Sequence, residues 1–228
     1  MDDWRNLLYP LGYLSSFLFG ARIVIQWLSS EVKQKSVVPT VFWKLSLGGN
    51  LMLMMHSFIQ VQFHVFIIQI GNAVISWRNL NLKKPPEDRI RLKKVIYILV
   101  ATLTCSSLMF FIFNDLSFGW FRIPNFENKS ASAISPIWHV IGFIGLALFS
   151  SRFWIQWIEA EKQKTSTLGP LFWWISLAGD LLILVYFAKI KDPVNLIGPI
   201  FGIIPYIRNL ILISKRNKIS KNKSVLHG

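Results

Sequence analysis

The chain has 228 residues and a mass of 26.3 kDa, with 53% hydrophobic residues, 16% charged residues, a formal net charge of +14 and a mean hydropathy of +0.44. Soluble domains carry about 25% charged residues, and the apolar residues here form long runs, so an ordinary soluble domain is excluded. The single cysteine, Cys105, excludes a disulfide framework and a cysteine-rich metal site. The acidic start, Asp2-Asp3, lacks the basic region of a secretory signal, so we expect no cleaved leader.

Seven segments approach or exceed the length of about 20 apolar residues that a helix needs to cross a bilayer. In chain order they are 7–29, 39–57, 59–79, 95–114, 136–158, 170–189 and 193–214. The fourth segment is the clearest because it carries no charge. The second and third are the weakest, because only a short polar stretch separates them and they could form one kinked hairpin. The sequence predicts an all-α integral membrane protein with seven transmembrane helices.

The basic residues predict the orientation, because short cytoplasmic loops carry an excess of Lys and Arg. With the N-terminus outside and the C-terminus in the cytoplasm, fifteen of the 25 Lys and Arg residues fall on the cytoplasmic side. The basic tail is expected to meet anionic lipid headgroups, at about 1 kcal/mol per charge. Since the positive charge is divided among several loops, nucleic acid is not an expected partner.

The sequence aligns with itself at an offset of 130 residues. Arg22–Trp27 aligns with Arg152–Trp157, and Arg78–Leu80 aligns with Arg208–Leu210, without a gap between them. A constant offset over this distance indicates an internal repeat.

Each repeat contains three predicted spans, and four spans separate equivalent helices, so both copies have the same orientation. The predicted architecture is 3+1+3, two parallel three-helix repeats joined by a linker helix, and a ligand is expected at the interface of the repeats. The boundaries are 7–82 for the first repeat, 83–135 for a basic loop, linker helix and external loop, 136–214 for the second repeat and 215–228 for the tail.

The repeated pattern is Arg-x-x-x-Gln-Trp, then Glu with a Lys-Gln-Lys-Ser/Thr loop, then Phe-Trp-x-x-Ser and Arg-Asn-Leu. It resembles the lipid A biosynthesis N-terminal domain family, in two tandem copies. The first copy departs from the pattern because it has no counterpart of Asp192-Pro193. The family is in turn similar to PQ-loop and SWEET proteins, whose three-helix bundles are duplicated around a linker helix. Gln26 and Gln156 lie where the glutamine of a PQ motif would fall.

The resemblance implies a place in the bacterial inner membrane and in lipid A or lipopolysaccharide biosynthesis. Members of the family stand before the catalytic domain of lipid-A-disaccharide synthase in some proteins, whereas the wider superfamily consists mostly of transporters and receptors. This sequence contains no glycine-rich nucleotide-binding segment, so we do not expect these residues alone to catalyse that synthase reaction. The sequence leaves enzymatic activity undecided.

Polar residues at equivalent positions inside the predicted spans are the candidates for binding a ligand. Arg22 and Arg152 lie about seven residues, or roughly 10 Å, inside the cytoplasmic ends of their spans. A charge at this depth is costly and usually faces an interior or a partner, although snorkelling to the headgroups is an alternative. The glutamines four residues later lie on the same helix face.

The second span of each repeat carries a second pair of polar residues at i and i+4. These are Ser46 with Asn50, and Ser176 with Asp180. Asp180 is the only acid near the middle of a predicted span. It could pair with Arg152 or Arg208, or it could exchange a proton, because burial favours the neutral form of a carboxyl group.

Two pseudosymmetric cationic half-sites are expected near the cytoplasmic face: Arg22, Gln26, Arg78, Asn79 and Arg152, Gln156, Arg208, Asn209. Guanidinium groups bind phosphate through two parallel hydrogen bonds, so the expected ligand is an anionic glycolipid or a polyprenyl phosphate. Tight helix packing is the alternative explanation for the polar residues of the third and seventh spans. No cofactor is expected, and the histidines lack the spacing of metal ligands.

Three functions remain from the sequence. The favoured one is a protein that binds, presents or moves an anionic glycolipid, with a membrane-associated glycosyltransferase as its expected partner. A variant of this function is an accessory component of the lipid-A-disaccharide synthase step. The second is a SWEET-like carrier of a small solute. The third is an enzyme that uses Asp180 and the arginines as a site inside the membrane.

Overall fold

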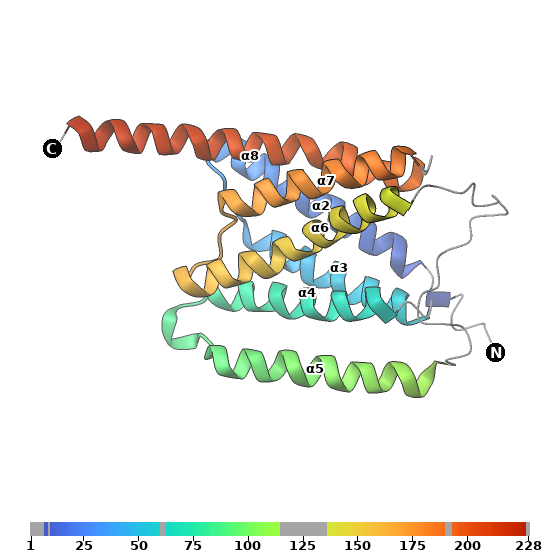
Figure 1. Cartoon of the computed structure of the whole chain (residues 1–228). Helices are drawn as coiled ribbons and strands as arrows, with labels where there is room; N and C mark the ends of the chain where they lie inside the picture. The colour runs from blue at the N-terminus through green and yellow to red at the C-terminus, as the bar shows by residue number, and fades with distance from the viewer. Residues whose placement is uncertain (1–6, 9, 60–62, 115–135, 190–192, 227–228) are drawn as a thin grey trace. The chain divides into compact units, whose positions relative to one another are not determined.

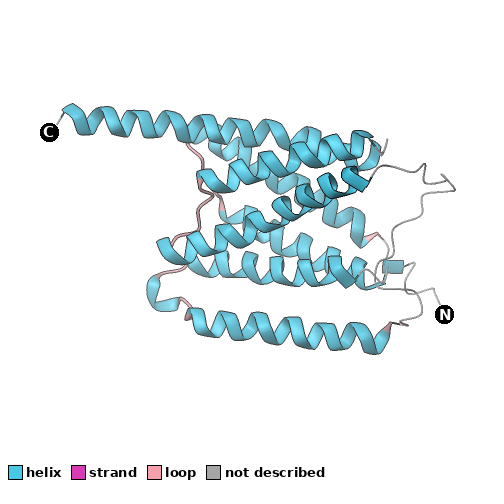
Figure 2. Cartoon of the chain, viewed as in Figure 1, coloured by secondary structure: helices cyan, strands magenta, loops and turns pink. Residues whose placement is uncertain are grey.

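The computed structural model describes residues 7–8, 10–59, 63–114, 136–189 and 193–226. Within these ranges the chain forms seven α-helices and one short 3-10 turn, with no β-strand (Figures 1 and 2). The elements are α2 (Leu11–Lys33), α3 (Thr40–Ile59), α4 (Phe63–Leu82), η1 (Pro86–Asp88), α5 (Leu92–Phe113), α6 (Pro136–Gln163), α7 (Pro170–Lys189) and α8 (Pro193–Leu226). The predicted all-α class is confirmed.

Four helical stretches in the described part of the chain are long and apolar enough to cross a membrane. They are Leu11–Lys33, Pro86–Phe113, Val140–Gln163 and Pro170–Lys189. Large apolar side chains on these helices are exposed, as is typical of surfaces that contact lipid; Ile112 on α5, for example, is 74% exposed. These features are typical of a membrane protein. The other three predicted spans correspond to α3, α4 and α8, and their crossing of the membrane stays a prediction.

Equivalent helices of the two repeats end in the same way. Gln34 and Lys164, which follow α2 and α6, both have left-handed backbone conformations, with φ of 48° and 53°. Lys35 N–H donates to the carbonyl of Ser30, and Thr165 N–H donates to that of Ala160, both at 3.2 Å. This is the hydrogen bond of a Schellman C-cap. The cap turns the chain sharply after the last helical residue in both copies.

Packing divides the chain into two compact units that do not follow the order of the sequence. Unit 1 contains the described parts of Met1–Arg22 and Thr40–Asn128, together with Ala160–Ser166. Unit 2 contains Ile23–Pro39, the described parts of Lys129–Glu159, and those of Thr167–Gly228. Each unit therefore includes a short segment from the end of the first helix of the other repeat.

Aromatic packing attaches the linker helix α5 to the helices of unit 1. Helix α3 packs on α4, and α4 packs on α5, which lies beside it (Figure 1). The buried side chains at the centre are Phe66, Ile70 and Phe110. The ring of Phe110 lies 5.2 Å from that of Phe66 and 5.8 Å from that of Phe58, within the range of favourable aromatic contacts.

Glycines bring the backbones of α6 and α7 close together in unit 2. A Cβ atom at Gly179 would lie 3.0 Å from the carbonyl oxygen of Gly145 and 2.9 Å from the backbone nitrogen of Phe149. Small residues at such crossings are typical of helix packing in membranes. Arg152 lies about one helical turn after Phe149 on α6, and Asp180 directly follows Gly179 on α7.

Candidate functional site

Arg22 is buried on α2 and is held by a hydroxyl group and two aromatic rings. Its side chain is 7% exposed, and Nη1 donates a hydrogen bond of 2.9 Å to Ser46 Oγ on α3. The guanidinium carbon lies 4.5 Å from the ring centre of Phe19 and 5.5 Å from that of Phe42. Cation–π contacts of this kind stabilise a desolvated guanidinium.

Arg152 has equivalent surroundings in unit 2, with one difference in its hydrogen-bond partner. The guanidinium carbon lies 3.5 Å from the ring centre of Phe149 and 5.7 Å from that of Phe172. Nη1 donates to Tyr206 Oη on α8 at 3.1 Å. Ser176, the counterpart of Ser46, donates to the carbonyl of Phe172 at 2.6 Å instead.

Asn50 and Asp180 occupy equivalent positions but differ in their hydrogen bonding. Asn50 Nδ2 donates to Ser76 Oγ at 3.1 Å. Asp180 is 2% exposed, and its Oδ2 has no hydrogen-bond partner in the part of the chain that the structure describes. The charge of Arg152 acts on Asp180, but the two side chains do not form an ion pair within the described residues.

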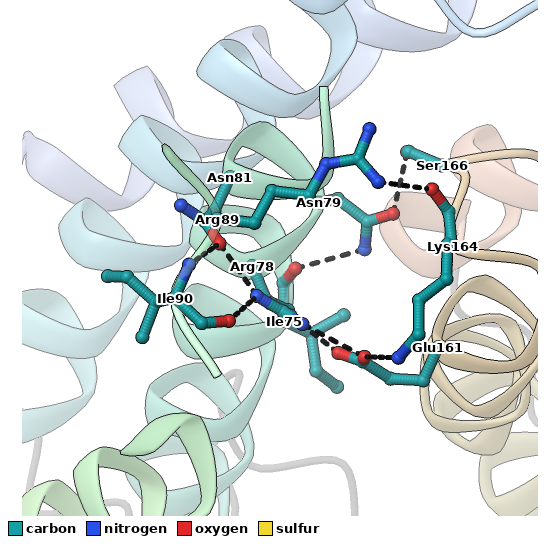
Figure 3. Close-up of polar contacts among 9 residues, drawn as sticks. All are labelled: Ile75, Arg78, Asn79, Asn81, Arg89, Ile90, Glu161, Lys164 and Ser166. Atoms are coloured by element: carbon teal, nitrogen blue, oxygen red, sulfur yellow. Dashed lines mark hydrogen bonds and ion pairs between the residues drawn. The ribbon is translucent and has the colours of Figure 1, made fainter. Parts of the chain in front are cut away.

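Arg78 makes contacts on all sides of its guanidinium in unit 1 (Figure 3). Nε and Nη2 donate to the two carboxylate oxygens of Glu161 at 2.5 and 2.9 Å. Nη1 donates to Asn81 Oδ1 at 2.6 Å and to the carbonyl of Ile90 at 2.7 Å. The guanidinium of Arg78 is thus buried in a charge-assisted, two-bond ion pair with further hydrogen bonds to Asn81 and Ile90.

Arg208, the counterpart of Arg78, binds a carboxylate from the first repeat in unit 2. Nε and Nη2 donate to the two carboxylate oxygens of Glu31 at 2.7 and 2.6 Å. This ion pair is more exposed, at 28% for the Arg208 side chain and 38% for that of Glu31. The fork geometry matches that of the pair in unit 1.

The amide side chains also bond across the repeats. Gln26 Nε2 donates to Asn209 Oδ1 at 2.9 Å, and Asn209 Nδ2 donates back to Gln26 Oε1 at 3.2 Å. In unit 1, Ser166 Oγ donates to Asn79 Oδ1 at 2.6 Å (Figure 3). Gln156 Nε2 donates to the carbonyl of Thr167, as Gln26 does to that of Val37.

The structure therefore pairs the candidate residues differently from the two half-sites expected from the sequence. Arg78 and Arg208 bind glutamates, whereas Arg22 and Arg152 lie between aromatic rings. The sequence reasoning gave no role to Glu31, Glu161 or Tyr206, although the two glutamates match at the same 130-residue offset as the arginines. The ligand-binding role of the twelve candidates stays a prediction. No three His, Cys, Asp or Glu side chains in the described ranges are placed to hold a metal ion.

Comparison with known protein families decides the origin of the repeat. The lipid A biosynthesis N-terminal domain matches this sequence twice, at residues 11–81 and 141–211. The chain belongs to this family. The two matches confirm the duplication. All twelve candidate ligand-binding residues of this chain lie inside the matched ranges.

The relatives that contain this domain are longer proteins. The chain is 38% identical to the lipid-A-disaccharide synthase of Chlamydia felis over 216 aligned residues. The alignment covers 94% of this chain and 34% of the relative. Identity to the lipid-A-disaccharide synthases of Chlamydia caviae and Chlamydia pneumoniae is 37%, over 95% and 93% of this chain. The chain is homologous to the N-terminal third of these proteins. No solved structure matches.

Proposed function

We propose that this chain is an inner-membrane domain of lipid A or lipid-linked glycan biosynthesis that binds an anionic glycolipid and presents or moves it. The observation that carries the proposal is the homology over 94% of the chain to a protein named lipid-A-disaccharide synthase. The relatives continue for about twice the matched length beyond this region, so the role proposed here is that of the membrane-embedded part. A membrane-associated glycosyltransferase is the proposed partner.

The proposed topology has seven membrane crossings, an external N-terminus and a cytoplasmic C-terminus. The seven helices of the described ranges and the positive charge of the loops between them support it. In this topology the two repeats are parallel, and α5 restores the orientation of the second copy. The residues that link the repeats, Arg78 with Glu161 and Arg208 with Glu31, then lie near the cytoplasmic ends of their proposed membrane spans.

Arg22 and Arg152 are the proposed contacts for the phosphate of the glycolipid. Arg78 and Arg208 are less suitable, because each already donates two hydrogen bonds to a carboxylate. Aromatic rings lie against Arg22 and Arg152, and electrostatic attraction to a phosphate is stronger beside apolar groups than in water. Ser46 and Tyr206 orient the two guanidinium groups.

Native mass spectrometry of the chain in mild detergent tests this proposal. The wild type is expected to carry a stoichiometric glycolipid or polyprenyl phosphate that the Arg22→Ala/Arg152→Ala double variant lacks. The matched control is Lys221→Ala, which removes a tail charge and is expected to leave the adduct in place. A double variant that keeps the adduct, or equal losses in both variants, would show general surface electrostatics instead of a site.

A wild type that is as bare as the double variant would contradict the glycolipid proposal and favour a small-solute carrier. The Arg22→Lys/Arg152→Lys variant separates binding from folding, because it keeps both charges but loses the planar fork. It is expected to remain monodisperse and to retain less of the lipid than the wild type. Thermal unfolding of each variant in the same detergent identifies any that fails to fold.

A further inference from the structure

Three buried polar atoms on α6 and α7 lack a hydrogen-bond partner within the described residues. They are Asp180 Oδ2, Arg152 Nε and Trp173 Nε1. The three side chains are 2%, 4% and 3% exposed. Leaving a buried polar or charged group unpaired is costly, so a group that both donates and accepts hydrogen bonds would stabilise this cluster.

Gly202 on α8 shows that two oxygens of this region lie close together. A Cβ atom at Gly202 would lie 3.0 Å from Asp180 Oδ2 and 3.1 Å from Tyr206 Oη. Both side chains therefore pack against the glycine, and Tyr206 Oη also accepts the hydrogen bond from Arg152. The two oxygens are close enough for one hydroxyl group to bond to both.

The first repeat differs at each of these positions. It has Asn50 in place of Asp180, Ser76 in place of Tyr206 and Asn72 in place of Gly202. Asn50 donates to Ser76, and Ser76 donates to the backbone carbonyl of Asn72, whereas the side-chain oxygen of Asn72 has no hydrogen-bond partner within the described residues. Of the two repeats, only the second has an acidic acceptor at the first position and a glycine at the last.

We propose that Asp180 selects the headgroup of the bound lipid by accepting a hydrogen bond from a hydroxyl group next to the phosphate on Arg152. A carboxyl group can accept hydrogen bonds in either protonation state, and a guanidinium or an indole only donates them. The complementary ligand is thus a phosphate that carries a neighbouring hydroxyl, as in a sugar phosphate. Trp173, whose ring centre lies 5.9 Å from that of Tyr206, is the proposed second donor to this headgroup. This inference rests on the proposed function, since it requires the phosphate to bind Arg152.

Two lipids that differ in their hydroxyl groups test the inference. Phosphatidylglycerol and phosphatidylmethanol share a phosphodiester, but only the first has hydroxyl groups beside it. Competitive native mass spectrometry with both lipids is expected to show a preference of about tenfold or more for phosphatidylglycerol, the size typical of a charge-assisted hydrogen bond. Asp180→Asn keeps only a weaker, neutral acceptor and is expected to reduce this preference without weakening phosphatidylmethanol binding. The control Asn50→Ala, at the equivalent position, is expected to keep it.

Gly202→Ala is the second variant, because it fills the contact point while Asp180 stays in place. It is expected to weaken phosphatidylglycerol more than phosphatidylmethanol, and it decides the question if Asp180→Asn does not fold. Equal binding of both lipids to the wild type would overturn the inference and indicate that water satisfies the buried atoms. Binding of neither lipid would instead contradict the phosphate site itself. A preference that survives both variants would also overturn the role of Asp180.

Discussion

The same arginine–glutamate fork occurs in both units, but with different burial. In unit 1 the side chains of Arg78 and Glu161 are 3% and 10% exposed, whereas those of Arg208 and Glu31 in unit 2 are 28% and 38% exposed. Each arginine uses Nε and Nη2 to bind both carboxylate oxygens. Equivalent residues with equal hydrogen bonds therefore have unequal access to solvent.

The chain that follows each arginine explains the difference. After α4, Pro85-Pro86 supplies two residues without a backbone N–H, so the helix ends at Leu82 and the chain folds back. The returning segment covers Arg78 with the carbonyl of Ile90. The second repeat has Lys215-Arg216 at the equivalent positions, so α8 continues to Leu226. The two repeats thus contain one buried and one half-exposed ion pair, because only the first repeat has prolines after its Arg-Asn-Leu motif.

The largest effect is expected for Glu161→Gln, which leaves the buried charge of Arg78 without its counterion. Removing one partner of a buried ion pair typically costs about 3–5 kcal/mol of unfolding free energy. Denaturant or thermal unfolding in mild detergent measures the loss. The double variant Arg78→Met/Glu161→Met is the control, and it is expected to recover most of the stability because no charge then remains unpaired. A single-variant loss no larger than that of Glu31→Gln would contradict the comparison.

A smaller effect is expected for Asn81→Ala, which removes a residue present only in the first repeat. Asn81 Oδ1 accepts hydrogen bonds from Arg78 Nη1 at 2.6 Å and from the backbone N–H of Ile90 at 3.0 Å. Losing an acceptor for buried donors costs about 1–3 kcal/mol. The unfolding free energy measures this cost, and Ile211→Ala, at the equivalent exposed position, is the control. Equal losses for both variants would mean that Asn81 does not support the fork.

Helix positions and the repeat could be predicted from the sequence, because apolar runs and a constant offset are local or periodic signals. The second and third predicted segments correspond to two helices, α3 and α4, which pack on each other. The extent of α8 was not predicted, because hydropathy ends the seventh span at 214, where the basic residues begin. Those residues are compatible with a helix, and no proline or glycine interrupts 215–226.

The pairing of the candidate residues could not be predicted, because it depends on contacts between distant segments. Glu31 follows the end of its predicted span and is 177 residues away from Arg208. The half-sites expected from the sequence assumed that residues of one repeat act together, whereas the forks join the two repeats. The position equivalent to Tyr206 in the first repeat is Ser76, so Tyr206 was not among the residues that match between the repeats.

The smallest effect is expected for Glu31→Gln, because water screens the half-exposed fork of unit 2. Partly exposed ion pairs contribute little to stability, and added salt weakens them further. The midpoint of thermal unfolding in detergent is therefore expected to fall less than in Glu161→Gln, and the difference from the wild type is expected to shrink between low and high sodium chloride. The loss in Glu161→Gln is expected to change little with salt, since solvent ions do not reach that pair. If both losses had the same salt dependence, the two forks would be equally accessible and the covering role of the segment after Pro86 would be wrong.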